Sequence, residues 1–255
     1  SRELAAEVDR LGSASPDTRL HLDLAGRDPA VAVTTIPYVK GAAFLRAVEH
    51  AVGREAFDAW LRAWFARHAF GPVTSATFVR ELHEGLLDRS DRDAARALDV
   101  DAWVYAPGIP ADAPRPASAT LARVDGLAGA FAARAIGADA WTPQEWRHFL
   151  NALPRALPAD RLADLDATFA LSASTNAEVL FPWLRLALGA AYAPALPAAE
   201  RFLVAQGRGK YVRPLYQALV STAWGAPEAR RIYARARPRY HATVTGVVDG
   251  IVGAP

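Results

Sequence analysis

The 255-residue chain contains neither cysteine nor methionine. The absence of cysteine excludes disulfides, thiolate catalysis and cysteine-ligated zinc, and it leaves the redox compartment undetermined. Because methionine is also absent, the sequence does not begin at a start codon. We therefore expect it to be a processed product, a fragment, or a chain that has lost its start.

The chain also lacks long apolar runs and a strong excess of charge. No run of about 18 apolar residues occurs, so no membrane span is predicted, and the first residues, Ser1–Leu4, lack the apolar core of a signal peptide. With 29 basic and 27 acidic side chains, the formal charge of +2 does not predict a nucleic-acid partner. The composition, 52% hydrophobic and 22% charged, is typical of a soluble globular protein and leaves cytoplasmic and exported locations open.

Motifs for metal and nucleophilic catalysis are missing as well. The zinc motif H-E-x-x-H needs two histidines one helical turn apart, whereas His83-Glu84-Gly85-Leu86-Leu87 ends in leucine. No histidine has another four residues away, and we expect each to be a surface or capping residue: His21, His50, His68, His83, His148 and His241. Neither G-x-S-x-G nor a phosphate-binding P-loop motif occurs. The sequence therefore predicts no metal site in this chain.

Apolar residues at helical spacing predict an all-α protein without a strand ladder. Helices are expected over residues 37–52 and 54–68 and after the capping residue Thr74. Shorter, paired helices follow in the second half, which suggests an α-solenoid of the armadillo or HEAT type. These are expected near residues 119–137, 158–169, 196–206, 211–222, 227–236 and 239–252. Capping boxes are predicted at Thr142–Glu145 and at Thr175–Glu178.

A domain boundary is predicted in the stretch Tyr105–Pro116, which holds four prolines. Such a proline-rich segment is typical of a linker or a stiff surface crossing. We place the two domains at residues 1–112 and 113–255.

The segment Ala205–Leu215 sets two cations between glycines: Arg208 follows Gly207, and Lys210 follows Gly209. Residues two apart diverge on a helix but share a face of an extended segment. Glycine favours the extended conformation here, since it permits φ > 0 and close approach of a ligand. Arg offers a planar fork to a carboxylate and Lys a point charge, so an anion site is predicted. The alternative is a solvated turn with two surface cations.

Tyr38 follows Pro37 at the start of a predicted helix. Unpaired N–H groups and the helix dipole make that end locally positive. A phenol there can donate a hydrogen bond to a developing oxyanion, which makes Tyr38 a candidate catalytic residue. The alternative is an aromatic ring packed on its own first turn.

Five segments are distributed over most of the chain: Thr18–Leu24, Ile36–Gly41, Asp101–Pro110, Phe181–Leu186 and Gln206–Lys210. In their sequences, their order and their separations they resemble segments of the zinc aminopeptidases of the leukotriene-A(4) hydrolase family. The resemblance implies that residues 1–112 are the C-terminal, helical part of a thermolysin-like catalytic domain. It implies that residues 113–255 form an armadillo-like helical domain, with the active site in a cleft between the domains.

The resemblance also implies roles for particular residues. Tyr38 matches the tyrosine that stabilises the tetrahedral intermediate of peptide hydrolysis. Arg208 and Lys210, with Gly207 and Gly209 beside them, match the residues that bind the carboxylate of a short peptide. The segment Trp103–Pro110 is expected to be structural.

Two departures from the family limit this expectation. The family's H-E-x-x-H, its downstream glutamate ligand and its G-x-M-E-N motif precede the matched region and are absent here. We therefore expect zinc in the parent enzyme, no zinc or activity in this chain alone, and the missing zinc-binding part as a partner. The Asp and second Tyr of the epoxide-hydrolysing members are Ala30 and Val33 here, so leukotriene chemistry is not expected.

The sequence thus predicts part of a zinc aminopeptidase that acts on short peptides with a free C-terminal carboxylate. The alternatives are a non-catalytic helical scaffold or peptide-binding module, and a metal-free regulatory paralogue. An H-E-x-x-H encoded upstream of Ser1 would favour the enzyme, and a start codon directly before Ser1 would exclude it for this chain.

Overall fold

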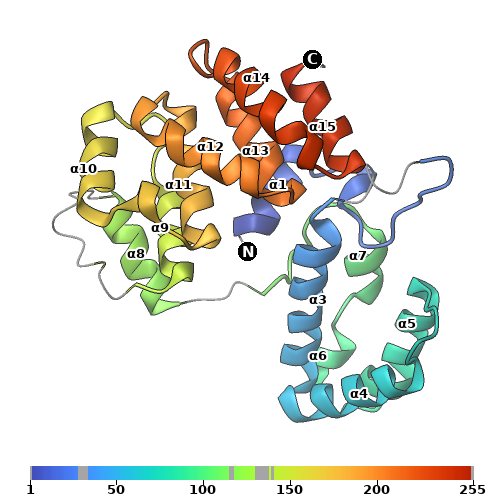
Figure 1. Ribbon diagram of the computed structural model, residues 1–255. Coiled ribbons are helices and arrows are strands. Elements are labelled where there is room, and N and C mark those ends of the chain that lie inside the picture. The colour runs from blue at the N-terminus through green and yellow to red at the C-terminus, as the bar shows by residue number, and fades with distance from the viewer. Residues whose placement is uncertain (1, 28–33, 115–117, 130–137, 139–140, 254–255) are drawn as a thin grey trace. The chain divides into compact units, whose positions relative to one another are not determined.

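The computed structural model describes residues 2–27, 34–114, 118–129, 138 and 141–253. These residues form helices and turns and no strand, which confirms the all-α prediction (Figure 1). The chain divides into two compact units, Ser1–Pro116 and Ala117–Pro255. This division follows Pro116, the last residue of the proline-rich segment, whereas the predicted boundary lies after residue 112.

The first unit is built around one long helix, α3, which packs against α1, α4 and α6. Its core contains Phe44 of α3, whose ring stacks on the fully buried Trp103 at a centroid distance of 5.7 Å. The elements are α1 (Arg2–Leu11), the 3-10 turn η1 (Pro16–Thr18), α3 (Ile36–Val52), α4 (Arg54–Arg67), α5 (Ser75–Leu82), the π-helical turn η2 (His83–Leu87), α6 (Asp93–Arg96) and α7 (Val100–Tyr105).

The segment after α7 is tied back to the start of the unit. The N–H of Gly108 donates to the hydroxyl of the buried Thr18 at 2.8 Å. Gly108 has φ of 76°, and a Cβ there would lie 3.1 Å from the carbonyl oxygen of Ser13. Backbone of this kind favours glycine. These contacts agree with the structural role expected for Trp103–Pro110.

Lys40 fixes α3 to the segments on either side of it. Its side chain is fully buried, and its ammonium donates to the carbonyl oxygens of Thr18 at 3.1 Å and Ala106 at 2.8 Å. Burial, and then the nearby charge of Arg19, lower the pKa of Lys40 to about 8. Because Tyr38 lies on the same helix, this anchor also holds the first turn that carries Tyr38.

We expect the free energy of unfolding of the wild-type protein to rise, relative to that of Lys40→Met, as the pH increases from about 8 to 10.5. In this window the unfolded chain still holds a proton that the folded chain has released, so raising the pH favours folding. The full shift in the pKa of Lys40, from 10.5 to about 8, corresponds to a gain of about 3 kcal/mol in the free energy of unfolding across this pH window. Denaturant unfolding of both proteins across this pH range measures the difference, and a constant difference would contradict the assignment.

The second unit is a longer array of helices. Its elements are α8 (Ala119–Gly129), α9 (Pro143–Ala152), α10 (Ala159–Phe169), η5 (Leu171–Ala173), α11 (Ala177–Gly189), η6 (Ala193–Ala195), α12 (Leu196–Ala205), α13 (Gly209–Val220), α14 (Gly225–Ala236), η7 (Arg237–Arg239) and α15 (Ala242–Val252). The helix predicted over 119–137 is described only to Gly129, because the residues that follow lie outside the described part.

The helices of the second unit pack in chain order as two rows. In one row α8 contacts α9, α9 contacts α11, α11 contacts α13, and α13 contacts α15, while α12 contacts α14 in the other. The core includes the fully buried Trp183 of α11, whose indole N–H donates to the Ser172 hydroxyl at 2.9 Å. This succession of neighbouring helices is the arrangement expected of an armadillo-like array.

Side-chain caps define several helix starts. Thr74 accepts a hydrogen bond from the N–H of Thr77 at 3.1 Å and caps α5, as predicted. Thr142 and Glu145 form the capping box expected at α9. A second box predicted for Thr175 and Glu178 is wrong, because the cap of α11 is Asn176.

Candidate functional site

Tyr38 lies in the first turn of α3 with its side chain exposed. The residue is 74% exposed, which argues against a ring packed on its own first turn. Its N–H is bound to the carbonyl oxygen of the N-cap residue Thr35 at 3.1 Å. Glu7 of α1 also reaches this helix end, where hydrogen bonds from Arg10 first, and then from Thr35, lower the pKa of its carboxyl group. The tyrosine hydroxyl is thus presented to solvent from a rigid helix.

The prediction of one extended segment around Arg208 and Lys210 is wrong in part, because α13 begins at Gly209. Arg208 is extended, and its carbonyl oxygen accepts the first helical hydrogen bonds, from the N–H groups of Tyr211 at 2.9 Å and Val212 at 3.1 Å. Lys210 therefore belongs to the first helical turn.

The two glycines of this segment do not adopt the conformation reserved for glycine. Neither Gly207 nor Gly209 has a positive φ. A Cβ at Gly209 would make an ordinary contact, 3.7 Å from the side chain of Val244. The backbone geometry expected from these glycines is therefore not what brings the cations together.

The ring of Tyr211 brings the two cations together instead. The guanidinium carbon of Arg208 lies 5.8 Å from the ring centroid, and the Lys210 ammonium lies 4.9 Å from it. Cations within about 6 Å of an aromatic face are attracted by the ring quadrupole. The ring is held in turn by Phe181 and Phe202, at centroid distances of 5.2 and 5.6 Å. We call Arg208 and Lys210 the clamp.

Glu178 of α11 contacts the clamp, although the sequence did not predict that it belongs to this site. Its Oε1 accepts hydrogen bonds from the Lys210 ammonium at 2.6 Å and the Tyr211 hydroxyl at 2.7 Å, and its Oε2 lies 3.6 Å from Arg147. The bond from Lys210, followed by that from Tyr211, lowers the pKa of Glu178, and the same carboxylate raises the pKa of Lys210. Both groups of this pair are therefore charged at neutral pH.

Arg208 differs from Lys210 in its partners. Within the described part of the chain, its guanidinium forms no ion pair, and its described contact is the ring of Tyr211. The first turn of α13 contains no acidic residue. Arg208 can therefore offer its donors to an anion from outside.

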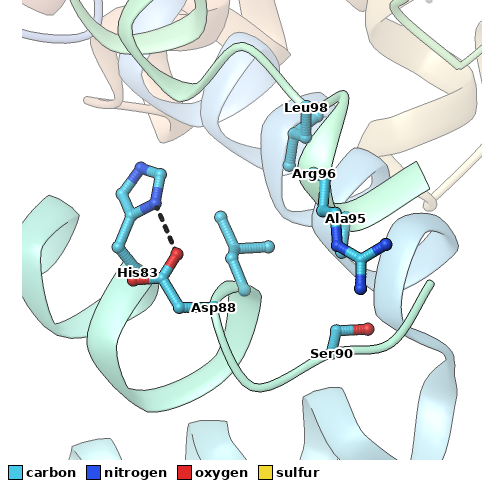
Figure 2. A pocket seen from close by; sticks show the side chains of 7 residues that line it. His83, Asp88, Ser90, Ala95, Arg96 and Leu98 are labelled. Carbon is cyan, nitrogen blue, oxygen red and sulfur yellow. Dashed lines mark ion pairs between the residues drawn. The ribbon is translucent and has the colours of Figure 1, made fainter. Parts of the chain in front are cut away.

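A hollow of about 300 Å³ lies elsewhere, at the π-helical turn η2. Figure 2 shows His83 and Asp88 in it, joined by an ion-pair contact of 3.5 Å, with Ser90 and Arg96 nearby. None of the predicted site residues lines this hollow.

Most histidines with described contacts meet polar partners. His68, His83 and His148 lie 2.8 to 3.5 Å from carboxylate oxygens, and His241 caps α15. Among the described residues, no three His, Cys, Asp or Glu side chains are grouped so that they could hold a metal ion. The described residues also contain no helix long and apolar enough to cross a membrane.

The structure does not test the predictions about Ala30 and Val33, or the prediction that Tyr38 and the clamp share one cleft. Ala30 and Val33 lie outside the described residues. Tyr38 belongs to the first compact unit and the clamp to the second, and each unit is described by itself.

Two family models match the chain. The model of the Peptidase family M1 domain matches residues 5–103, which include Tyr38. The model named Leukotriene A4 hydrolase, C-terminal, matches residues 141–252, which include the clamp.

Individual relatives agree with these matches. The chain is 28% identical to leucine aminopeptidase 2 of Ajellomyces capsulatus, with 97% of this chain and 41% of the relative covered. It is 27% identical to leukotriene A-4 hydrolase of Xenopus laevis, with 86% and 37% covered. The chain thus spans about two fifths of the length of these curated relatives.

A solved structure shows the same fold. Native yeast LTA4 hydrolase superposes with a TM-score of 0.77 at 23% identity, over 99% of this chain and 44% of that one. One family model matches most of each compact unit, so the chain is similar to the M1 peptidase domain in its first unit and to the C-terminal domain of leukotriene A4 hydrolase in its second.

Proposed function

We propose that the intact protein is a zinc aminopeptidase that removes N-terminal residues from short peptides with a free C-terminal carboxylate. In this proposal the present chain supplies the oxyanion-stabilising tyrosine and the carboxylate-binding clamp. The observation that carries it is the clamp itself, in which Arg208 and Lys210 lie against one aromatic ring and Arg208 has no acidic partner among the described residues. The curated relatives named leucine aminopeptidase support the reaction class.

The clamp suits a terminal carboxylate for two reasons. The guanidinium of Arg208 can donate two parallel hydrogen bonds to a carboxylate, which fixes the orientation of the peptide as well as its position. Lys210 uses one of its three donors on Glu178 and can direct another at the same anion. A peptide whose C-terminus is amidated lacks the negative charge and loses most of this attraction.

Tyr38 suits the reacting end of the peptide. Attack of water on a peptide carbonyl places negative charge on its oxygen, and a positioned hydroxyl donor stabilises that charge in the transition state. Tyr38 offers such a donor from the first turn of α3, at the positive end of the helix dipole.

The zinc of such an enzyme does not fit the described residues, because no group of three suitable ligands occurs among them. The metal and its ligands would belong to a zinc-binding part of the intact protein outside these 255 residues.

The full-length protein is expected to release the N-terminal residue from trialanine with a KM about tenfold lower than from trialanine amide. The reason is that a charge-assisted hydrogen bond contributes roughly 1.5–3 kcal/mol to binding, and about 1.4 kcal/mol is a factor of ten. Steady-state kinetics with both peptides measures the ratio. Equal KM values would remove the carboxylate-binding role, and failure to hydrolyse either peptide would favour the non-catalytic scaffold.

A further inference from the structure

The clamp already holds a carboxylate of its own. Oε1 of Glu178 lies 2.6 Å from the ammonium of Lys210, so it occupies the kind of position that a peptide carboxylate would take on that lysine. The contact is accessible, since the Lys210 and Glu178 side chains are 50% and 37% exposed. A peptide that binds Lys210 must therefore share the ammonium with Glu178 or displace it.

The charges around the clamp also indicate that Glu178 weakens the binding of an anion. Three cations, Arg147, Arg208 and Lys210, are described around Glu178 and Tyr211, against the single carboxylate of Glu178. Positive charge remains in excess, which permits an anion to bind. The carboxylate nevertheless repels that anion and reduces the charge it meets.

We propose that Glu178 is a specificity-determining residue, an internal carboxylate that competes with the peptide's C-terminal carboxylate for Lys210 and weakens the clamp's preference for free-acid peptides. The inference rests on the proposed function of the clamp. Glu178 thus sets how strongly the clamp favours a peptide with a C-terminal carboxylate over one with an uncharged C-terminus. Arg208 orients the bound carboxylate.

Glu178→Gln separates the charge of this residue from its shape. The amide oxygen of glutamine can still accept hydrogen bonds from Lys210 and Tyr211, but the negative charge is gone. A role in competition predicts tighter binding of the free acid after this change. A role in merely holding Lys210 in place predicts no change or weaker binding.

The experiment uses the full-length protein and N-acetyl-trialanine, whose blocked N-terminus prevents aminopeptidase cleavage, together with its C-terminal amide. Calorimetric titration of wild type and Glu178→Gln is expected to show about a threefold lower Kd for the acid in the variant, because exposed charge pairs contribute up to about 1 kcal/mol. The Kd of the amide is expected to stay unchanged. Glu200→Gln is the matched control, since Glu200 pairs with Arg231 and Arg235 instead of the clamp.

The outcomes separate this inference from the proposed function. If wild type binds the acid no better than the amide, the clamp itself is refuted, and the role of Glu178 falls with it. If wild type prefers the acid but Glu178→Gln leaves that preference unchanged or weaker, the clamp stands and the competing role of Glu178 is overturned. Equal gains in Glu178→Gln and Glu200→Gln would also overturn it, because they would show a general effect of charge.

Discussion

Tyr38→Phe is expected to lower the kcat of the full-length enzyme by about 10²–10³-fold, with little change in KM. The substitution removes the hydroxyl donor and keeps the ring, so an interaction made mainly in the transition state is lost. Because Tyr38 is 74% exposed, the loss of its hydroxyl should cost little folding stability. Steady-state hydrolysis of trialanine gives both constants.

A matched control is Tyr105→Phe. Tyr105 lies in the same compact unit, at the end of α7, and its ring contacts His21 in the structural part of that unit. This variant should keep the wild-type kcat. A kcat for Tyr38→Phe within about twofold of wild type would remove the oxyanion role assigned to Tyr38.

The helices were predictable from the sequence because their signals are local. Thr74 and Thr142 cap α5 and α9 as expected, since a hydroxyl at an N-cap needs only a backbone N–H two or three residues away. The helix beginning near Pro37 likewise follows from apolar spacing, with Phe44 and Val48 buried on one face. Such signals do not depend on distant parts of the chain.

The start of α13 was mispredicted because tertiary packing outweighs glycine's preference for irregular backbone. Tyr211 and Val212 are buried, and their N–H groups are bound by the carbonyl of Arg208, so the helix extends back to Gly209. A glycine costs only about 1 kcal/mol in a helix relative to alanine. Burial of the following side chains is enough to offset that cost.

The failed capping box at Thr175 and the missed role of Glu178 have one cause. A glutamate three residues after a threonine matches the capping pattern, but the carboxylate of Glu178 instead accepts hydrogen bonds from Lys210 and Tyr211. These partners lie more than 30 residues away in sequence, on another helix. No local pattern links α11 to α13, so the cationic pair could be proposed from sequence, whereas its aromatic support and its internal carboxylate could not.

The most direct measurement for the clamp is the effect of Arg208→Ala on KM for trialanine and for trialanine amide in the full-length enzyme. Removal of a charge-assisted hydrogen bond worth roughly 1.5–3 kcal/mol should raise KM for the free acid by about tenfold to a hundredfold. KM for the amide should change little, and Arg213→Ala, an exposed arginine on the same helix, should leave both constants near wild type. An equal rise in KM for acid and amide would contradict the account and make Arg208 a structural residue.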